Sequence, residues 1–530
     1  MTPSAHIDHF VLDHLPPAEQ QPTLIFGDLT YPERLNAASE LLRRAIASAG
    51  AEAPALIDFD LEFSWGRVDA ISSRMAKVLV EEMGLVPGNR VLLHGPNASW
   101  TVMAWFAILK AGGVVVATMP MLRPAELAIV IDKAQVSHAL VYAAFAKVVG
   151  EAQAAAPTLK HVMDSATLQA ACMTRTADFV AVDTSAEDPA LIAFTSGTTG
   201  KPKGCVHFHR DVLAMADTFA RHVVKLTKDD IIVGTPPIAF TFGLGGLVVF
   251  PAAVGAATAF AERPGFDALA ETIAGRRATA LFTAPTGYRA LLKLAGQHDL
   301  SSLRTCVSAG EALPAATSDA WHEATGVRII DGIGSTEMIH VFISASGGDI
   351  RPGATGKAVP GYEARIHDEA GAPLPPGQTG RLAVRGPTGC RYLDDERQAA
   401  YVQNGWNLTG DIYRQDADGY FWFVARADDM IVSSGYNIGA PEVENALLTH
   451  PAVAEAAVIG APDEERGQIV KAFVVPNAGH APSDALRLAL QDHVKAVIAP
   501  YKYPRALDFV DALPKTSTGK VQRFRLKADA

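Results

Sequence analysis

The chain has 530 residues, with 46 Lys and Arg against 57 Asp and Glu and a formal net charge of −11 at pH 7. This length exceeds one ordinary hydrophobic core, so at least two domains are expected. The acidic balance excludes a nucleic-acid binder that depends on overall positive charge. The four cysteines lie far apart without a C-x-x-C pair, which indicates reduced thiols in a cytoplasmic protein.

The N-terminal half has the pattern of an α/β fold. Residues 1–22 lack the apolar core of a signal peptide, so export is not expected. Farther on, Arg90–His94 and Val114–Ala117 are predicted strands, and Trp100–Lys110 between them has helical apolar spacing. This alternation predicts parallel strands joined by crossover helices, with the active site at the carboxyl ends of the strands.

A loop rich in glycine and hydroxyl side chains, Thr195–Gly204, follows the apolar run Leu191–Phe194. Its glycines allow close backbone approach, and its hydroxyls, Lys201 and Lys203 supply donors and positive charge for phosphate oxygens. Pro202 stands where the P-loop motif needs a metal-binding hydroxyl, so a P-loop NTPase is excluded. We interpret the segment as a phosphate-holding loop, and a flexible surface turn is the alternative.

Residues 231–261 contain no charged side chain, which meets the length criterion for a transmembrane helix. Three prolines and five glycines in this stretch would break such a helix several times. A buried strand, a glycine-rich turn and a core helix are therefore predicted instead of a membrane span.

A second glycine-lined turn, Gly332–Met338, follows the apolar segment Val327–Ile330. A carboxylate such as Glu337 beside a phosphate loop is useful mainly when a hard cation bridges the two, because carboxylate and phosphate repel each other. Mg²⁺ is therefore implied. A surface Thr-Glu pair is the alternative reading of this turn.

The pattern changes after Gly353. Residues 363–367 and 380–386, separated by Pro/Gly turns, predict a small antiparallel β unit, and the charged segment Arg426–Asp429 marks the expected domain boundary. Beyond it a compact α+β domain is predicted. Its helices and strands are expected at residues 441–448, 452–459, 470–475 and 483–498.

Two further motifs lie near the C-terminus. Thr409-Gly-Asp411 places a carboxylate after a tight turn, which suits a ribose diol, although Gly-Asp turns are common. Pro514–Lys520 carries lysines in a loop, and residues 501–530 hold seven Lys and Arg against three Asp. We interpret this segment as a cationic arm for an anionic substrate, and a solvated basic tail is the alternative.

In this order the motifs resemble those of the adenylate-forming superfamily, which includes acyl- and aryl-CoA synthetases, luciferases and peptide-synthetase adenylation domains. The resemblance covers nearly the whole chain. It implies an α/β fold class, with a large N-terminal domain (residues 1–427) of parallel and mixed sheets flanked by helices plus the small β unit. It also implies a mobile α+β C-terminal domain (residues 428–530) that rotates between two half-reactions. The motifs are Thr195–Gly204, Gly332–Glu337, Thr409–Asp411, Arg426–Asp429, Ser434–Asn437 and Pro514–Lys520.

The resemblance also implies the roles of single residues, with ATP, CoA and Mg²⁺ as cofactors. Lys520, Glu337 and Thr199 would be catalytic, and Glu337 and Thr199 would lie near Mg²⁺. Asp428 would be the hinge. The CoA tunnel would include Ser434, Gly435 and Tyr436. The nucleotide site would consist of Thr195, Ser196, Gly197, Thr198, Thr199, Lys203, Gly310, Glu311, Asp331, Gly332, Ile333, Gly334, Ser335, Thr336, Asp411 and Arg426.

Within the superfamily the chain most resembles 2-aminobenzoate-CoA and benzoate-CoA ligases. Phe240 and Phe242 would form a short aromatic slot, too shallow for a long alkyl chain, and Thr241 would offer a hydroxyl to an ortho amino group. His340 would either border the aryl ring or be a core histidine. The aryl-substrate pocket would consist of His207, Phe240, Thr241, Phe242, Gly243, Ala309, Gly332 and His340.

The expected activity is that of an ATP-dependent aryl-CoA ligase. It would convert an aromatic carboxylate, foremost 2-aminobenzoate, through an aryl-AMP to the aroyl-CoA, with release of AMP and pyrophosphate. A benzoate-CoA ligase, a stand-alone aryl-AMP ligase that loads a carrier protein, and a non-catalytic nucleotide-binding scaffold remain alternatives. Neither nucleic acid nor a membrane is an expected partner, whereas a homodimer and a lysine acetyltransferase acting on Lys520 are left open.

Overall fold

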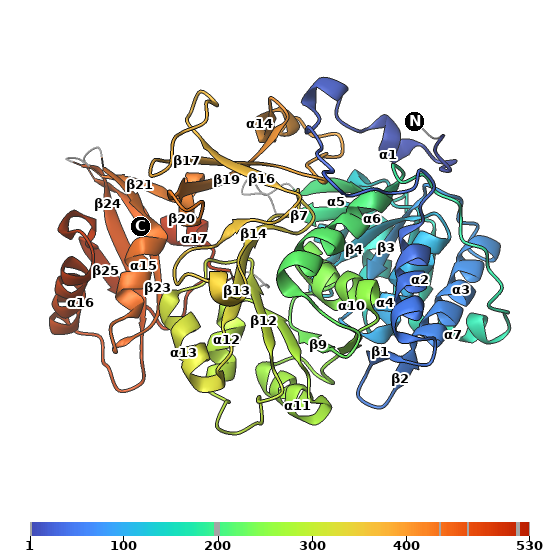
Figure 1. Ribbon diagram of the computed structural model, residues 1–530, viewed down its shortest axis with the longest axis horizontal. Coiled ribbons are helices and arrows are strands. Elements are labelled where there is room, and N and C mark those ends of the chain that lie inside the picture. Colours follow the sequence, from blue (N-terminus) through green and yellow to red (C-terminus); the bar gives the residue numbers. More distant parts are fainter. Residues whose placement is uncertain (1–2, 196–201, 434–435, 464–465, 516–519, 529–530) are drawn as a thin grey trace.

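The computed structural model describes residues 3–195, 202–433, 436–463, 466–515 and 520–528 (Figure 1). The six-stranded sheet lies at one end of the molecule, and the C-terminal elements, in orange and red, lie at the other. The N-terminal domain contains this sheet, a nine-stranded sheet and a five-stranded antiparallel sheet. Within the described ranges, none of the helices combines the length and the apolarity of a membrane span.

The six-stranded sheet has the order β6-β5-β3-β4-β7-β8, and every neighbouring pair is parallel except β7 and β8. It carries the phosphate loop, because β7 ends at Thr195 and β8 begins at Lys203. Its strands are β3 (Arg90–His94), β4 (Val114–Thr118), β5 (His138–Val141), β6 (His161–Asp164), β7 (Pro189–Thr195) and β8 (Lys203–Phe208).

Helices surround this sheet. Every residue of α4 except the half-buried Trp100 is buried, including Lys110, in keeping with a helix that is apolar on all sides. Lys110 is accommodated by hydrogen bonds to Asp69 and Ser73. The helices of this region are α1 (Phe10–Asp13), α2 (Ala37–Ala49), α3 (Trp65–Glu81), α4 (Ser99–Lys110), α5 (Pro124–Lys133), α6 (Ala146–Ala155), α7 (Ser165–Met173) and α8 (His209–Met215).

The nine-stranded sheet is mixed, with the order β15-β14-β13-β12-β11-β9-β10-β1-β2. Strands β13, β12, β11, β9, β10 and β1 are parallel neighbours. The bounds are β1 (Pro54–Ile57), β2 (Glu62–Ser64), β9 (Ile231–Gly234), β10 (Ala257–Ala259), β11 (Ala280–Thr283), β12 (Thr305–Ala309), β13 (Ile329–Gly334), β14 (Val341–Ser344) and β15 (Lys357–Ala358). The helices that accompany it are α11 (Phe266–Arg276), α12 (Pro285–Leu292) and α13 (Ala315–Thr325).

Of the three elements predicted within residues 231–261, the buried strand and the core helix are confirmed, but the glycine-rich turn is wrong, because residues 241–254 with their glycines are helical. Helix α9 (Thr241–Leu244) continues through a π-helical segment (Gly245–Val249) into α10 (Phe250–Val254). The glycines permit close packing: a Cβ on Gly243 would lie 2.1 Å from the carbonyl oxygen of Pro237, and one on Gly246 would lie 2.7 Å from Cδ1 of Phe282. Tertiary packing therefore outweighs the low helix propensity of glycine.

The predicted β unit is the five-stranded antiparallel sheet, in which β16, β17, β19 and β18 are consecutive neighbours and β20 pairs with β19. It positions Asp411 opposite Arg426 on neighbouring strands. Its elements are β16 (Glu363–His367), β17 (Thr379–Arg385), α14 (Gln398–Tyr401), β18 (Val402–Gln403), β19 (Trp406–Gln415) and β20 (Phe421–Arg426).

The C-terminal part is α+β, as predicted. Ser483 caps α16 by accepting a hydrogen bond from the backbone N–H of Leu486, and a separate cluster of buried apolar side chains fills its core. Its elements are β21 (Met430–Ser433), β22 (Tyr436–Gly439), α15 (Ala440–Leu448), β23 (Val453–Asp463), β24 (Gly467–Pro476), α16 (Asp484–Val497), β25 (Ala506–Phe509) and α17 (Arg523–Ala528). The predicted fold class is confirmed.

Candidate active site

The turn between β13 and β14 carries Glu337. Glycine is required on β13, because a Cβ on Gly332 would lie 2.7 Å from Cγ1 of Val341 and one on Gly334 would lie 2.6 Å from the carbonyl oxygen of His340. Ile339 within the turn has φ of 64°, a conformation that is unfavourable for a β-branched residue. The turn is therefore a strained connection that needs support from neighbouring elements.

Glu337 is buried and is bound by two side chains from other parts of the chain. The Tyr392 hydroxyl donates a hydrogen bond to Glu337 Oε1 over 2.5 Å, and Lys203 Nζ lies 3.4 Å from the same oxygen. Lys203 also donates to the Tyr392 hydroxyl over 2.7 Å. The predicted residues Lys203 and Glu337, which are 134 positions apart in the sequence, thus lie side by side. Sequence reasoning missed Tyr392, which belongs to none of the recognised motifs.

His207 supports the same turn from β8. Its Nε2 donates a hydrogen bond to the carbonyl oxygen of Thr336 over 2.7 Å, and its Nδ1 lies 3.7 Å from Oδ2 of Asp211. Burial raises the pKa of Asp211, but the neighbouring imidazole of His207 and the charge of Arg210 outweigh this effect and hold the pKa below its usual value. His207, predicted to border the aryl pocket, is thus bound to the glutamate turn.

Asp411 and Arg426 form a pair across β19 and β20. Arg426 Nη1 donates to Asp411 Oδ1 over 3.1 Å and to the carbonyl oxygen of Thr409 over 3.2 Å. Burial raises the pKa of Asp411, and the charge of Arg426 opposes that shift. The pair offers carboxylate oxygens and a guanidinium to a ligand at the end of the small sheet.

Lys520 from the C-terminal part reaches the turn after β12. A Cβ on Gly310 would lie 3.9 Å from Cε of Lys520. Part of the Lys520 side chain is exposed, yet the surrounding protein desolvates its ammonium and lowers its pKa, against the attraction of Glu311, Asp411 and Glu337. The predicted catalytic lysine and the predicted nucleotide residues therefore meet in one place.

Asp331 lies at the carboxyl end of β13, beside the end of β12. Its Oδ1 atom is buried and has no hydrogen-bond partner among the described residues. Burial raises the pKa of Asp331 to about 7. A buried acceptor without a partner suits a ligand that brings its own N–H donors, such as the amino group of adenine.

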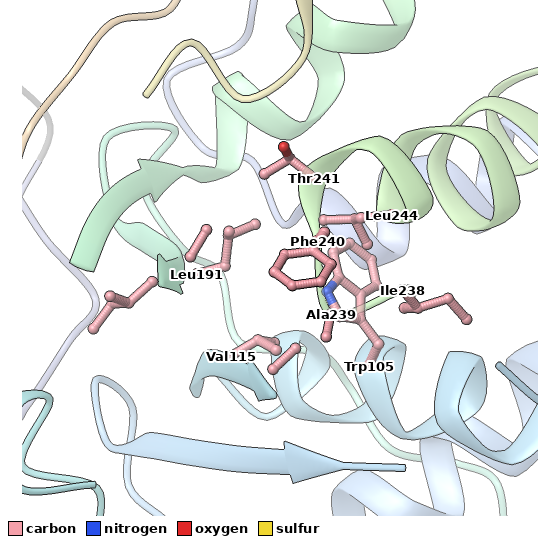
Figure 2. A pocket seen from close by; sticks show the side chains of 11 residues that line it. Trp105, Val115, Leu191, Ile238, Ala239, Phe240, Thr241 and Leu244 are labelled. Carbon is pink, nitrogen blue, oxygen red and sulfur yellow. The ribbon is translucent and has the colours of Figure 1, made fainter. Parts of the chain in front are cut away.

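An apolar pocket lies between α4, strands β4 and β7 and the start of α9 (Figure 2). Two of the residues assigned to the aryl pocket, Phe240 and Thr241, line it, and Thr241 is its one polar side chain. The Thr241 hydroxyl points away from the ring of Phe240. The full lining is Trp105, Val115, Ala117, Leu191, Ile192, Ala193, Ile238, Ala239, Phe240, Thr241 and Leu244.

His340 lies in an aromatic cluster. Its ring centroid is 4.6 Å from that of Phe250, 5.3 Å from that of Phe219 and 5.8 Å from that of Phe242. Burial lowers the pKa of His340 to about 3, so the imidazole is neutral at physiological pH. Of these neighbours Phe242 is itself a predicted pocket residue. The other six residues predicted for the aryl pocket are absent from the lining shown in Figure 2. They are His207, Phe242, Gly243, Ala309, Gly332 and His340.

Several predicted residues fall outside the described ranges. Ser196, Gly197, Thr198 and Thr199 of the phosphate loop do so, as do Ser434 and Gly435 of the expected CoA tunnel. Asp428, the predicted hinge, belongs to a 3₁₀ turn over Ala427–Asp429. Tyr436 is exposed and its ring lies 4.7 Å from that of Tyr501.

The carboxylate of Glu337 suits a Mg²⁺ ion that binds together with a nucleotide. Over the described ranges, no group of three or more His, Cys, Asp and Glu side chains could hold a metal ion by itself. Mg²⁺ commonly takes one or two carboxylates and completes its shell with phosphate oxygens and water. Glu337 suits this role because Oε1 is held by Tyr392 and Lys203, whereas Oε2 accepts no hydrogen bond from the described residues.

Comparisons with known proteins agree with this geometry. The AMP-binding enzyme family matches residues 42–391, and the AMP-binding enzyme C-terminal domain matches residues 442–520. Benzoate--CoA ligase of Thauera aromatica is 35% identical over 508 residues, which cover 94% of this chain and 96% of that protein.

Two solved structures extend the similarity. The anthranilate CoA ligase AuaEII in complex with anthranoyl-AMP has a TM-score of 0.90 and 37% identity, covering 94% of this chain and 98% of that one. A benzoate CoA ligase from Burkholderia xenovorans LB400 has a TM-score of 0.84 and 32% identity, covering 93% and 99%.

The two-part fold and the matches over nearly its whole length assign the chain to one class: it belongs to the AMP-binding enzyme family. The predicted resemblance to the adenylate-forming superfamily and its aryl-CoA ligase branch is confirmed. Within the family, the protein is an acid–thiol ligase.

Proposed function

We propose that the protein is an ATP-dependent aryl-CoA ligase that acts on 2-aminobenzoate. The observation that carries the choice of acid is the likeness to the anthranilate ligase, whose TM-score of 0.90 exceeds the 0.84 of the benzoate ligase. Thr241 supports it, because it carries the one hydroxyl among the side chains that line the pocket. A hydroxyl can accept a hydrogen bond from an ortho amino group.

In the first half-reaction the carboxylate of the acid attacks the α-phosphate of ATP. Two anions approach each other, so positive charge is needed where the negative charge accumulates. Lys520 supplies it from the side of Gly310, and Lys203 supplies it from β8. Mg²⁺, when bound through Glu337 and Thr199, would neutralise phosphate charge. The products are aryl-AMP and pyrophosphate.

The adenine and the ribose of ATP are bound by two different groups of residues. Asp331 accepts from the adenine amino group, and Ile333 beside it provides apolar contact for the ring. Asp411 accepts hydrogen bonds from the ribose hydroxyls, while Arg426 orients the Asp411 carboxylate and faces the phosphate. In the described conformation Lys520 lies near Gly310, which suits this half-reaction.

In the second half-reaction the CoA thiol attacks the aryl-AMP carbonyl, and AMP leaves. We assign this step to a second orientation of the C-terminal domain (residues 428–530), reached by rotation about Asp428. Ser434, Gly435 and Tyr436 would then line the pantetheine tunnel. The exposure of Tyr436 supports this assignment, because the side chain is open to a new contact. The partial exposure of Lys520 would also admit a lysine acetyltransferase.

Benzoate is the second candidate acid, because ten of the eleven residues that line the pocket are apolar. The preferred acid is identified by measuring CoA-dependent AMP formation with each of six acids. They are benzoate, 2-aminobenzoate, 2-hydroxybenzoate, 4-hydroxybenzoate, phenylacetate and a medium-chain fatty acid. A lead of about tenfold in kcat/KM for 2-aminobenzoate, equivalent to about 1.4 kcal/mol, supports the proposal. A lead for benzoate overturns the choice of acid.

Carrier loading is tested in the same assay. Aryl-AMP formation without any CoA-dependent turnover would favour a stand-alone aryl-AMP ligase. No adenylation of any acid would overturn the proposal as a whole.

A further inference from the structure

Tyr392 is fixed beside the phosphate loop by its own backbone. The N–H of Val206 donates to the carbonyl oxygen of Arg391, and the N–H of Leu393 donates to that of Gly204, each over 2.8 Å. These bonds join the segment to β8, directly after the phosphate loop. The side chain of Tyr392 is almost fully buried, so its hydroxyl has little freedom to move.

The Tyr392 hydroxyl stands between a cation and an anion. It accepts a hydrogen bond from Lys203 Nζ over 2.7 Å and donates one to Glu337 Oε1 over 2.5 Å, while Lys203 and Glu337 themselves are 3.4 Å apart. Lys203 Nζ also lies 4.6 Å from the centroid of the Tyr392 ring. Burial raises the pKa of Tyr392 far above its usual value, with Glu337 adding to the shift, so the hydroxyl keeps its proton.

We infer that Tyr392 is a positioning residue that fixes Lys203 and Glu337 in the geometry needed to receive Mg²⁺ and the phosphates of ATP. The inference rests on the proposed role of Glu337. With the hydroxyl in place, Glu337 Oε1 is occupied and Oε2 is left for the metal. Without it, the Lys203–Glu337 ion pair, now 3.4 Å long, shortens, which withdraws the ammonium from the phosphates and the carboxylate from Mg²⁺.

Tyr392→Phe tests this inference because it removes one oxygen and keeps the ring. We expect the Mg²⁺ concentration for half-maximal adenylation to rise about tenfold, the size expected for hydrogen bonds to charged groups. The KM for the aryl acid should change less than twofold. As a readout that does not depend on turnover, the Tm increase given by ATP with Mg²⁺ over ATP with EDTA should shrink in the variant.

Tyr288→Phe is the matched control. Tyr288 is also fully buried, and its hydroxyl donates to the carbonyl oxygen of Val307 over 2.9 Å. Within the described ranges its hydroxyl bonds to backbone carbonyl oxygens, those of Leu281 and Val307, and to neither Glu337 nor Lys203. We expect this variant to lose a similar amount of stability and to keep the Mg²⁺ dependence of the parent, which separates a general loss of packing from the specific effect.

A double-variant cycle with Glu337→Gln gives the decisive outcome. If Tyr392 acts through Glu337, Tyr392→Phe adds little to the loss of Mg²⁺ response already caused by Glu337→Gln. Additive losses in the double variant overturn the inference. An unchanged Mg²⁺ response in Tyr392→Phe, when Glu337→Gln does shift that response, also overturns it. Both outcomes leave the proposed role of Glu337 intact. An unchanged response in Glu337→Gln overturns both.

Discussion

Cε of Lys520 lies 3.9 Å from the position that a Cβ would take on Gly310. This contact joins the last loop of the chain to the turn after β12, more than two hundred positions earlier. It brings Lys520 next to Gly310, one of the predicted nucleotide residues, as the proposed adenylation step requires.

Substitution of Lys520 should separate the two half-reactions. Lys520→Ala should lower the rate of aryl-AMP formation by at least about a hundredfold, because a charge that stabilises the transition state is lost. Thioester formation from supplied aryl-AMP and CoA should fall less than about threefold. Pyrophosphate exchange measures the first step, and release of AMP from aryl-AMP measures the second. Equal losses in both steps would contradict the assignment.

The same lysine should produce an alkaline limit in the pH profile of adenylation. Desolvation lowers the pKa of Lys520 below its usual value, so the ammonium loses its proton at a lower pH than an exposed lysine does. Adenylation should therefore decline at a pH below 10.5, the usual pKa of a lysine. In Lys520→Arg the decline should disappear, because the guanidinium stays protonated. An unchanged decline would assign the limit to another group.

Substitution of Thr241 should change the choice of acid. Thr241→Val keeps the shape of the side chain and removes its hydroxyl, so kcat/KM for 2-aminobenzoate should fall about tenfold while that for benzoate changes less than threefold. Thr241→Ser retains the hydroxyl and serves as the control. Parallel losses for both acids in Thr241→Val would show that the hydroxyl does not contact the ortho substituent.

Substitution of His207 should affect the nucleotide more than the acid. His207→Leu leaves the Thr336 carbonyl without its hydrogen-bond donor and removes the imidazole beside Asp211. This loss should cost about 1–3 kcal/mol of stability, and the KM for ATP should rise. His207→Gln, which retains an N–H donor, should recover part of both losses. Urea unfolding and initial rates measure them. A selective rise in the KM for the acid would instead support the predicted place of His207 at the aryl pocket.

Asp331 should destabilise the fold at high pH. Its pKa is raised by burial from 3.8 to about 7, so between these values the native state holds a proton that the unfolded chain has released. Stability should therefore fall as the pH rises from about 4 to 7. Asp331→Asn should raise Tm at pH 8 and have little effect near pH 4, whereas Asp60→Asn on the surface should change Tm at neither pH.

Local sequence patterns determined many of the elements and suggested the candidate site residues. The predicted bounds of the strands Arg90–His94 and Glu363–His367 agree with the observed ones. Such bounds can be predicted because a strand and the turns that end it are encoded by residues close together in the sequence. The ordered motifs indicated the family, because each has a distinctive composition at one place in the chain.

Only the tertiary structure decided which side chains meet. Residues 241–254 form a helix although glycine has a low helix propensity. The glycines are needed there because they allow close packing against Pro237 and Phe282. His207 is bound to Thr336, and Tyr392 lies between Lys203 and Glu337. These partners come from strands and turns that are distant in the sequence, and no local periodicity records a contact made when separate elements pack together.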